Sequence, residues 1–299
     1  MDEPADTDTD TDTETSNISD TTTWAELADQ TVTRLTAAGV DNAASEARWI
    51  VERAAGDPFR VVASRPATVR SHHHWRLMVE RREAGEPLQY VLERWPFRRL
   101  ELFVDRRVLV PRPETEVVVD AVLEEHVRVG GPVVDLGTGS GAIALSVAVE
   151  RPGTEVWGVE RSPGALAVAR ANCTGLGRRA GSVRLVEGDW YSPLPDEMRH
   201  GVGVVVSNPP YVTASEPLPA EVEQWEPLEA LRSGADGLDD IRQIVADAPA
   251  WLAAGGALVI EHAPSQAQAT RELALAAGFD SVRTGVDLTG RDRFLVARI

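Results

Sequence analysis

A run suited to a buried strand ends abruptly in the sequence VVVSNPPYV, residues 204–212. The valines favour a sheet, whereas Pro209 and Pro210 lack the N–H donors that a continuing strand needs. Each proline also holds the residue before it in an extended conformation, which stiffens the chain at Asn208. Two rigid hydrogen-bond acceptors remain at this turn, the side-chain oxygen of Asn208 and the carbonyl oxygen of Pro209.

Two fixed acceptors suit a substrate –NH2 group that is planar because its nitrogen lone pair is delocalised, as in an amide or an aromatic amine. Accepting both N–H bonds would aim the nitrogen at an electrophilic methyl group and stabilise the charge that develops on it. Tyr211 would close over the flat group. The predicted catalytic residues of an N-methyl transfer are therefore Asn208, Pro209, Pro210 and Tyr211. The alternative is a structural proline turn.

A glycine-rich loop in VVDLGTGSGAIAL stands where a buried strand turns into a helix. Glycines permit the tight turn and let a ligand lie against the backbone, where helix N–H groups point at negatively charged atoms. Glu160 ends the next strand, where a carboxylate can accept both hydroxyls of a ribose. The predicted loop residues are Gly137, Thr138, Gly139, Ser140 and Gly141. The loop alone also fits NAD, and a glycine turn without a ligand is the third possibility.

Asp135, two residues before the first glycine, favours one of these ligands. Its carboxylate suits an ammonium group and would repel a pyrophosphate. S-adenosylmethionine has an amino-acid end for Asp135 and an adenosine end for Glu160, so it is the predicted cofactor. Asp189 and Trp190 end the third strand, where Trp190 would stack on the adenine ring or serve only as hydrophobic cover.

The elements that must position these residues alternate between strand and helix from Glu114 onward. This pattern predicts an α/β fold, a doubly wound parallel sheet with helices on both faces. The last two strands have no convincing helix between them and should pair antiparallel. The strands are predicted at 132–136, 155–160, 182–187, 202–206, 257–261, 281–286 and 293–299.

Four regions are expected along the 299 residues. Residues 1–22 are rich in Asp and Thr and should form a disordered acidic tail. Residues 23–85 show helical periodicity with glycine stops, which predicts a small helical domain. Short apolar runs separated by DRR predict a β-hairpin bridge over 86–112. Residues 113–299 carry the α/β domain.

The composition of the chain argues against several classes of function. The net charge of −17 and the absence of lysine oppose stable nucleic-acid binding. No apolar run is long enough for a membrane span, and the acidic N-terminus does not resemble a secretory signal. One cysteine suits a reducing cytoplasm. The three histidines at 72–74 would point in different directions on a helix, so no metal site is predicted.

Several motifs together resemble one known family. They are GEPLQY (85–90), VLVPRPETE (108–116), DLGTGSGAIAL (135–145), SNPPYV (207–212) and EPLEAL…GADGLD (226–239). From about Trp24 to Ile299 the chain resembles the HemK-type protein-(glutamine-N(5)) methyltransferases, which modify peptide chain release factors. PRPETE is the most discriminating motif, since generic methyltransferases lack it. The chain departs from the family at Glu93, usually glycine, and near Arg98, where an aromatic residue is missing.

The resemblance implies a class I S-adenosylmethionine-dependent methyltransferase fold and methylation of the glutamine in the Gly-Gly-Gln motif of a release factor. It implies that the glycine loop, Glu160, Trp190 and Asn208 contact the cofactor, and that residues 208–211 hold the substrate glutamine. The helical domain would help to grip the release factor. The alternatives are an exocyclic amine of a nucleic-acid base, a glutamine of a ribosomal protein, and a non-enzymatic module that binds the cofactor.

Overall fold

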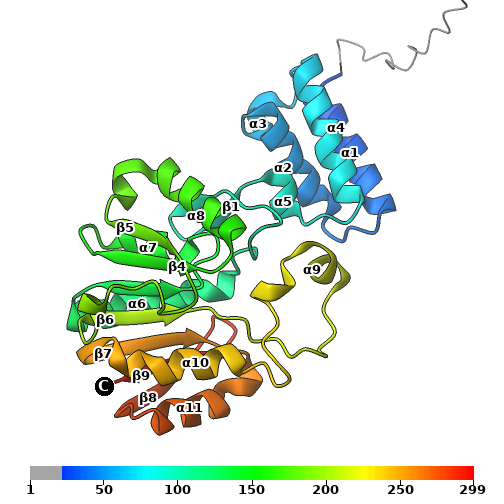
Figure 1. Ribbon diagram of the computed structural model, residues 1–299. Coiled ribbons are helices and arrows are strands. Elements are labelled where there is room, and N and C mark those ends of the chain that lie inside the picture. Colours follow the sequence, from blue (N-terminus) through cyan, green and yellow to red (C-terminus); the bar gives the residue numbers. More distant parts are fainter. Residues whose placement is uncertain (1–21) are drawn as a thin grey trace, which may run out of the picture. The chain divides into compact units, whose positions relative to one another are not determined.

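A computed structural model describes residues 22–299 (Figure 1). The predicted acidic tail, apart from Thr22, lies outside the described residues. The chain divides between Leu92 and Glu93 into two compact units, which are described separately. Within residues 22–299, no helix has the length and apolar character needed to cross a bilayer.

The first unit is helical, as the glycine-punctuated pattern predicts. Thr23 and Glu26 form a reciprocal capping box at the start of the first helix, and Gly56 ends the second in a left-handed conformation. Apolar side chains from the helices, including Leu35 and Met78, form its core. The helices are α1 (Trp24–Ala37), α2 (Ala43–Ala55), α3 (Phe59–Val62), α4 (Val69–Glu83) and α5 (Leu88–Leu92).

The hairpin predicted over 86–112 is shorter in the structure. Its two strands are β1 (Trp95–Phe97) and β2 (Leu100–Leu102), which pair antiparallel. Residues 88–92 form α5 instead of strand, because Leu88 and Val91 pack into the helical core of the first unit. Glu93 and Arg98 have φ of +54° and +50°. Glycine adopts such values most easily, which gives a physical reason for the glycine usual in the resembled family at Glu93.

A seven-stranded sheet forms the centre of the second unit, in the order β5-β4-β3-β6-β7-β9-β8. All strands are parallel to their neighbours except β9, which runs antiparallel to both β7 and β8. The α/β prediction and its antiparallel last strand are confirmed. The strands are β3 (Val133–Leu136), β4 (Val156–Glu160), β5 (Val183–Glu187), β6 (Val202–Ser207), β7 (Leu252–Glu261), β8 (Ser281–Val286) and β9 (Asp292–Arg298).

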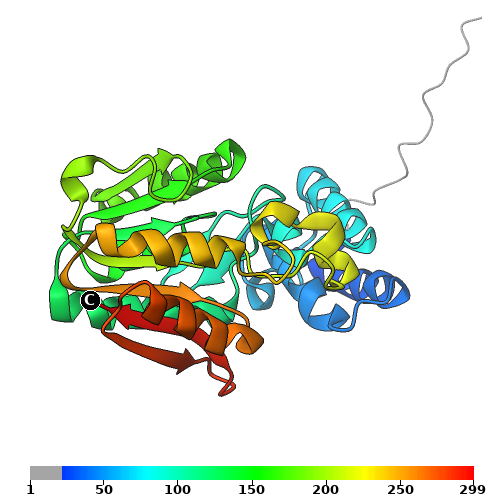
Figure 2. The ribbon, with the colours of Figure 1, turned by 60° about the horizontal axis from the view of Figure 1, so that its bottom comes forward.

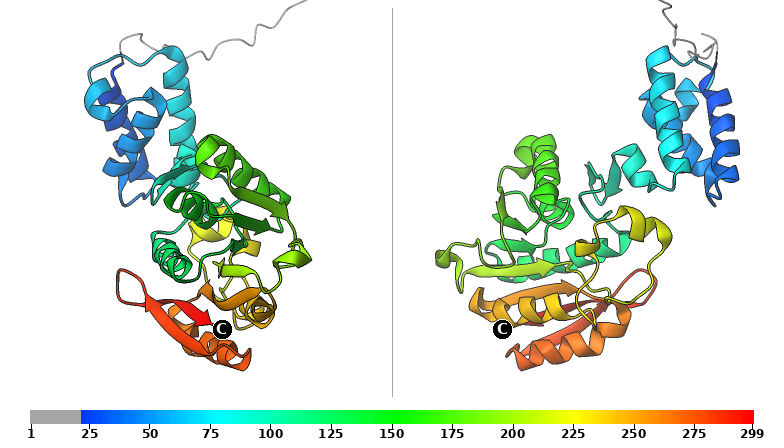
Figure 3. Two further views of the ribbon diagram at one scale, coloured as in Figure 1. Left: turned by 90° about the vertical axis from the view of Figure 1, so that its left-hand side faces the viewer. Right: turned by 45° about the vertical axis from the view of Figure 1, so that its right-hand side comes forward.

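Helices cover both sides of this sheet (Figure 3, left panel). Helix α6 contacts α7 on one side, and α10 lies beside α11 on the other (Figure 2). The helices are α6 (Glu116–Val129), α7 (Ala142–Glu150), α8 (Pro163–Leu176), α9 (Ala220–Trp225), α10 (Asp239–Asp247) and α11 (Ala267–Ala276). Single 3-10 turns are η1 (Pro113–Thr115), η2 (Gly177–Ala180), η3 (Asp196–Met198), η4 (Leu228–Ala230), η5 (Ala248–Ala250) and η6 (Pro264–Gln266).

The strand order reverses between β3 and β6, both of which are buried along their whole length. Leu136 pairs with Ser207 at their carboxyl ends, where the Ser207 hydroxyl donates a 2.7 Å hydrogen bond to the Leu136 carbonyl. The glycine loop follows β3 and the NPPY turn (residues 208–211) follows β6. Ligands of doubly wound sheets bind at such a reversal.

Candidate active site

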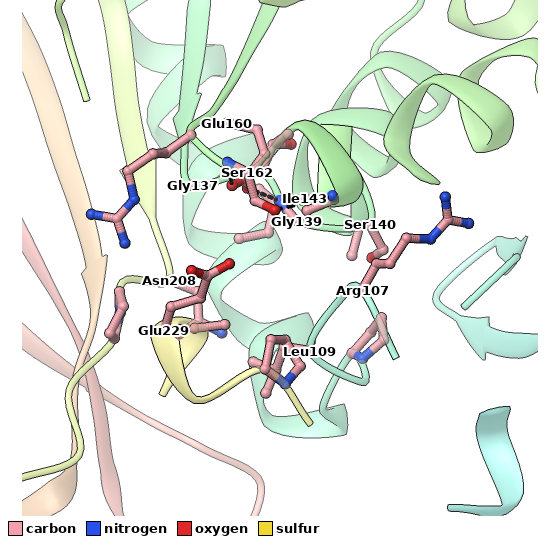
Figure 4. Close-up of a pocket in the computed structure, with 18 of the residues that line it drawn as sticks. Arg107, Leu109, Gly137, Gly139, Ser140, Ile143, Glu160, Ser162, Asn208 and Glu229 are labelled. Carbon is pink, nitrogen blue, oxygen red and sulfur yellow. Dashed lines mark hydrogen bonds between the residues drawn. The ribbon is translucent and has the colours of Figure 1, made fainter. Parts of the chain in front are cut away.

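A pocket opens at this reversal, entirely within the second unit, and encloses about 990 Å³ including its mouth. Three regions far apart in the sequence form its walls: the segment before α6, the loops after β3 to β6, and the turn η4. Figure 4 shows Glu160 on one side of the pocket and Asn208 with Glu229 on the other. Of the predicted site residues, those that line it are Gly137, Thr138, Gly139, Ser140, Glu160, Asp189, Trp190, Asn208 and Pro210.

Glu160 organises the glycine loop (residues 137–141). One carboxylate oxygen accepts the Gly139 N–H at 2.9 Å, and the other accepts the Ser162 N–H at 2.8 Å. Gly137, Gly139 and Gly141 all have positive φ, so this sharp turn favours glycine at each position. Each Glu160 oxygen retains a second lone pair for a ligand hydroxyl.

Asp135 lies beneath the glycine loop and does not line the pocket. Its side chain is only 1% exposed, and one oxygen accepts hydrogen bonds from the Thr138 hydroxyl and the Ala144 N–H, at 2.6 and 3.1 Å. The other oxygen is buried without a partner among the described residues. Burial raises the pKa of Asp135 to about 7, with a further contribution from the charge of Glu160.

Asp189 and Trp190 lie next to each other on the pocket wall after β5. Trp190 has a φ of +45°, unusual for a large side chain, and is largely buried. Its ring covers Gly137, where an added Cβ atom would come within 3.4 Å of the ring. The indole therefore forms part of the pocket floor beside the loop.

The NPPY turn is fixed by hydrogen bonds to its own backbone from neighbouring segments. The N–H groups of Tyr211 and Val212 both donate to the Leu231 carbonyl, and Gln266 donates to the Tyr211 carbonyl at 2.9 Å. Asn208 is half-buried on the pocket wall, and its Nδ2 donates to the Thr115 hydroxyl at 3.2 Å. Pro209 is buried, and neither it nor Tyr211 or Gly141 lines the pocket.

Two further wall segments carry motifs for which sequence reasoning proposed no site residues. The PRPETE segment (residues 111–116) and the EPLEAL segment (226–231) both line the pocket. Glu226 joins them by accepting hydrogen bonds from the Arg112 guanidinium at 2.6 Å and from the Val110 N–H at 3.1 Å. The additional lining residues there are Arg107, Leu109, Pro111, Arg112, Thr115, Pro227, Glu229 and Ala230. Apart from Arg107, all of them lie in motifs of the resembled family, which is the signal that could have identified them.

Comparison with known proteins decides the family. A methyltransferase small domain matches residues 114–223, and a PrmC N-terminal domain matches residues 26–92. Release factor glutamine methyltransferase of Burkholderia pseudomallei is 44% identical over 77% of this chain and 82% of its own length. The corresponding enzyme of Bifidobacterium longum is 36% identical over 91% and 98%. The chain belongs to the release factor glutamine methyltransferase family.

Membership in this family confirms the predicted fold class and an S-adenosylmethionine-dependent methyltransferase. Among solved structures, the hMettl16 catalytic domain in complex with MAT2A 3'UTR hairpin 1 superposes with a TM-score of 0.56. That match covers 72% of this chain and 79% of the other, at 17% identity, and so supports the fold alone.

The pocket fits the cofactor of this methyltransferase family. Gly137 and Gly139 leave backbone accessible at the end of β3, and Glu160 offers lone pairs to ribose hydroxyls. Asp135 lies beneath the loop, where its carboxylate, once ionised, would add negative charge that suits a cationic ligand. Trp190 and Asp189 line the pocket wall after β5, where the adenine is predicted to lie. Among residues 22–299, no group of metal-ligating side chains suggests a metal centre.

Proposed function

We propose that this enzyme transfers the methyl group of S-adenosylmethionine to the side-chain amide nitrogen of the glutamine in a release factor's Gly-Gly-Gln motif. The observation that carries the proposal is the orientation of Asn208. Its Nδ2 bonds to Thr115, so its Oδ1 is the atom left to accept an N–H from a substrate amide. The Pro209 carbonyl would supply the second acceptor.

When bound, the cofactor supplies a methyl group on a sulfonium. With the cofactor held by the glycine loop and Glu160, the amide nitrogen would form a new N–C bond to the methyl carbon as the S–C bond breaks, and the electron pair of that bond would return to sulfur. The nitrogen becomes positive and passes one proton to water. Asn208 and Pro209 contribute by aiming the nitrogen lone pair and by stabilising this positive charge.

Further parts of the proposal concern partners and location. The chain carries a net charge of −17, which disfavours lasting contact with nucleic acid. We propose a release factor as the protein partner and the cytoplasm as the place of action. The helical unit, which matches the PrmC N-terminal domain, would contribute to release-factor binding.

The test is transfer of a radiolabelled methyl group to a purified release factor, beside a form whose Gly-Gly-Gln glutamine is replaced. We expect labelling only of the intact motif. Asn208→Ala should lower turnover by about 10²–10³-fold, equivalent to about 2.7–4 kcal/mol, by analogy with the loss of one oxyanion-hole donor. Cofactor affinity should stay within roughly tenfold, since Asn208 is only one of many contacts in the pocket.

Labelling of structured RNA, of duplex DNA or of a ribosomal protein in preference to the release factor would contradict the proposed substrate. Cofactor binding without transfer to any glutamine-bearing protein would contradict the proposed activity. Near-normal turnover by Asn208→Ala would remove the assigned role of that residue alone.

A further inference from the structure

Three segments that are far apart in the sequence are joined to one another in a closed frame on the pocket wall. They are the PRPETE segment (residues 111–116), the NPPY turn (208–211) and the EPLEAL segment (226–231), and each contributes residues that line the pocket. In the proposed reaction only the NPPY turn has a role. The contacts that join the three segments indicate what the other two do.

The NPPY turn is hydrogen-bonded to both of the other segments. On one side Asn208 Nδ2 donates to the hydroxyl of Thr115 in the PRPETE segment, at 3.2 Å. On the other side the Tyr211 N–H donates to the carbonyl of Leu231 in the EPLEAL segment, at 3.1 Å. The position of Asn208 therefore depends on where both segments lie.

Glu226 closes the frame with a buried carboxylate. Its side chain is 2% exposed, and each of its oxygens has one partner. Oε1 accepts from the Arg112 guanidinium at 2.6 Å, and Oε2 accepts from the N–H of Val110, just before the PRPETE segment, at 3.1 Å. A buried charge is costly unless it is paired and hydrogen-bonded, so Glu226 holds both donors firmly. Arg112 lines the pocket, whereas Glu226 does not.

The frame lies at the end of the pocket where the substrate amide is expected. Figure 4 shows Asn208 and Glu229 on one side of the pocket and Glu160, which would hold the ribose, on the other. Loss of the Glu226 contacts would free the PRPETE and EPLEAL segments from each other. Asn208 would then lose its fixed position, while the contacts expected to hold the cofactor at Glu160 would remain.

We propose that Glu226 is a positioning residue, which closes the frame by binding Arg112 and the Val110 backbone and thereby holds Asn208 where it can accept from the substrate glutamine. This inference rests on the proposed function, because it assigns Asn208 to the substrate amide. Glu226 itself acts from outside the pocket. A displacement of about 1 Å in the reacting groups can lower turnover about a hundredfold.

The first experiment measures kcat and KM for the release factor, well below the melting temperature of each variant. Glu226→Gln keeps the shape of the side chain but turns an –NH2 group towards one of two donors, Arg112 or the Val110 N–H. We expect kcat to fall by about tenfold to a hundredfold. KM for the release factor and the Kd of S-adenosylmethionine should stay within about threefold of wild type, because the misplaced group acts mainly in the transition state.

Glu150→Gln is the matched control. Glu150 forms an ion pair with Arg98 in which both side chains are also mostly buried, with Arg98 Nε 2.6 Å from Glu150 Oε1, and neither residue lines the pocket. This variant should have a lower melting temperature and the wild-type kcat. It therefore separates a general loss of stability from a loss of positioning.

A double-mutant cycle tests the path through Arg112. Arg112→Met removes the guanidinium but keeps much of the bulk of the side chain, and it should lower kcat by a factor similar to that of Glu226→Gln. In the Arg112→Met background, a glutamine at position 226 can accept the Val110 N–H with its oxygen and no longer faces an arginine. The double variant should therefore be no slower than Arg112→Met alone.

Hydrogen–deuterium exchange tests the frame without any substrate. In Glu226→Gln the backbone amides of residues 108–112 and 226–231 should exchange about tenfold faster than in wild type, as the loss of a hydrogen bond to a charged group allows. In Glu150→Gln the exchange of these amides should be unchanged.

A kcat within twofold of wild type for Glu226→Gln would overturn the inference, as would unchanged exchange in these segments. An equal loss of kcat in Glu150→Gln, or effects that multiply in the double variant, would also overturn it. If the wild type does not methylate the release factor, the proposed function fails instead. The exchange experiment still decides in that case whether Glu226 closes the frame, so the two failures are distinguishable.

Discussion

Removing the Glu160 carboxylate should weaken cofactor binding strongly while leaving the fold intact. In the structure each oxygen already accepts one backbone N–H, from Gly139 and from Ser162. Glu160→Ala therefore loses the loop's organiser as well as the acceptors for the ribose. Hydrogen bonds to a charged group contribute about 1.5–3 kcal/mol each, and the half-exposed position of Glu160 puts them at the lower end. Two bonds to the ribose then amount to about 3 kcal/mol, or roughly a hundredfold in Kd.

Isothermal titration with S-adenosylmethionine and its demethylated product measures this effect directly. Glu160→Gln keeps the length and one acceptor but turns an –NH2 group towards a backbone N–H, so we expect about a tenfold increase in Kd. Glu187→Ala is the matched control. Glu187 pairs in register with Glu160 at the end of the neighbouring strand, yet it is exposed and outside the pocket. A Kd within threefold of wild type for Glu160→Ala would refute the reasoning.

The remaining predictions concern stability. Because the pKa of Glu261 is raised in the native protein, the folded chain binds a proton at this residue more tightly than the unfolded chain does. The contribution of Glu261 to the free energy of unfolding is therefore full below pH 4.5 and is lost as the pH rises through about 7. Urea unfolding should therefore find Glu261→Gln more stable than wild type at pH 8, by on the order of 3 kcal/mol, and similar at pH 4.5; equal differences at both pH values would contradict this. Glu125, buried in α6, accepts from Arg298 on β9 and from Arg128. Glu125→Ala should lower the free energy of unfolding by about 2–4 kcal/mol. This is less than the largest losses known for broken buried ion pairs, because both arginines can reach water. A loss under about 0.5 kcal/mol would show that the ion pairs of Glu125 contribute little to stability.

Sequence periodicity predicts the sheet well because its strands are valine-rich and separated by glycine stops. All seven strands lie within a few residues of their predicted positions, apart from the earlier start of β7 at Leu252. The hairpin region was less predictable. Residues 88–92 read as a short apolar run, and only the tertiary contacts of Leu88 and Val91 with the helical core decide that they form a helix.

The candidate site likewise has one part that the sequence predicts and another that it does not. Residues that follow parallel strands, such as Glu160 and Asn208, could be predicted because the carboxyl ends of strands meet at one edge. Asp135 illustrates a limit, since its position beside the glycines does not reveal that its carboxylate lies beneath them. The positions of Thr115 and Glu229 on the pocket wall depend on how irregular segments fold. The hydrophobic periodicity of the sequence does not predict how these irregular segments fold, although the motifs PRPETE and EPLEAL mark both of them.

Two buried acids lie on the strands on either side of β6, and neither lines the pocket. Asp135 on β3 and Glu261 on β7 each have one carboxylate oxygen without a partner among the described residues, and burial raises both pKa values to about 7. Amides of the same shape would avoid that cost. However, an ionised carboxylate only accepts hydrogen bonds, whereas an amide or a protonated carboxyl can also donate one. Keeping these groups ionised above pH 7 therefore costs stability, and Glu261→Gln should yield a protein that is harder to unfold at pH 8.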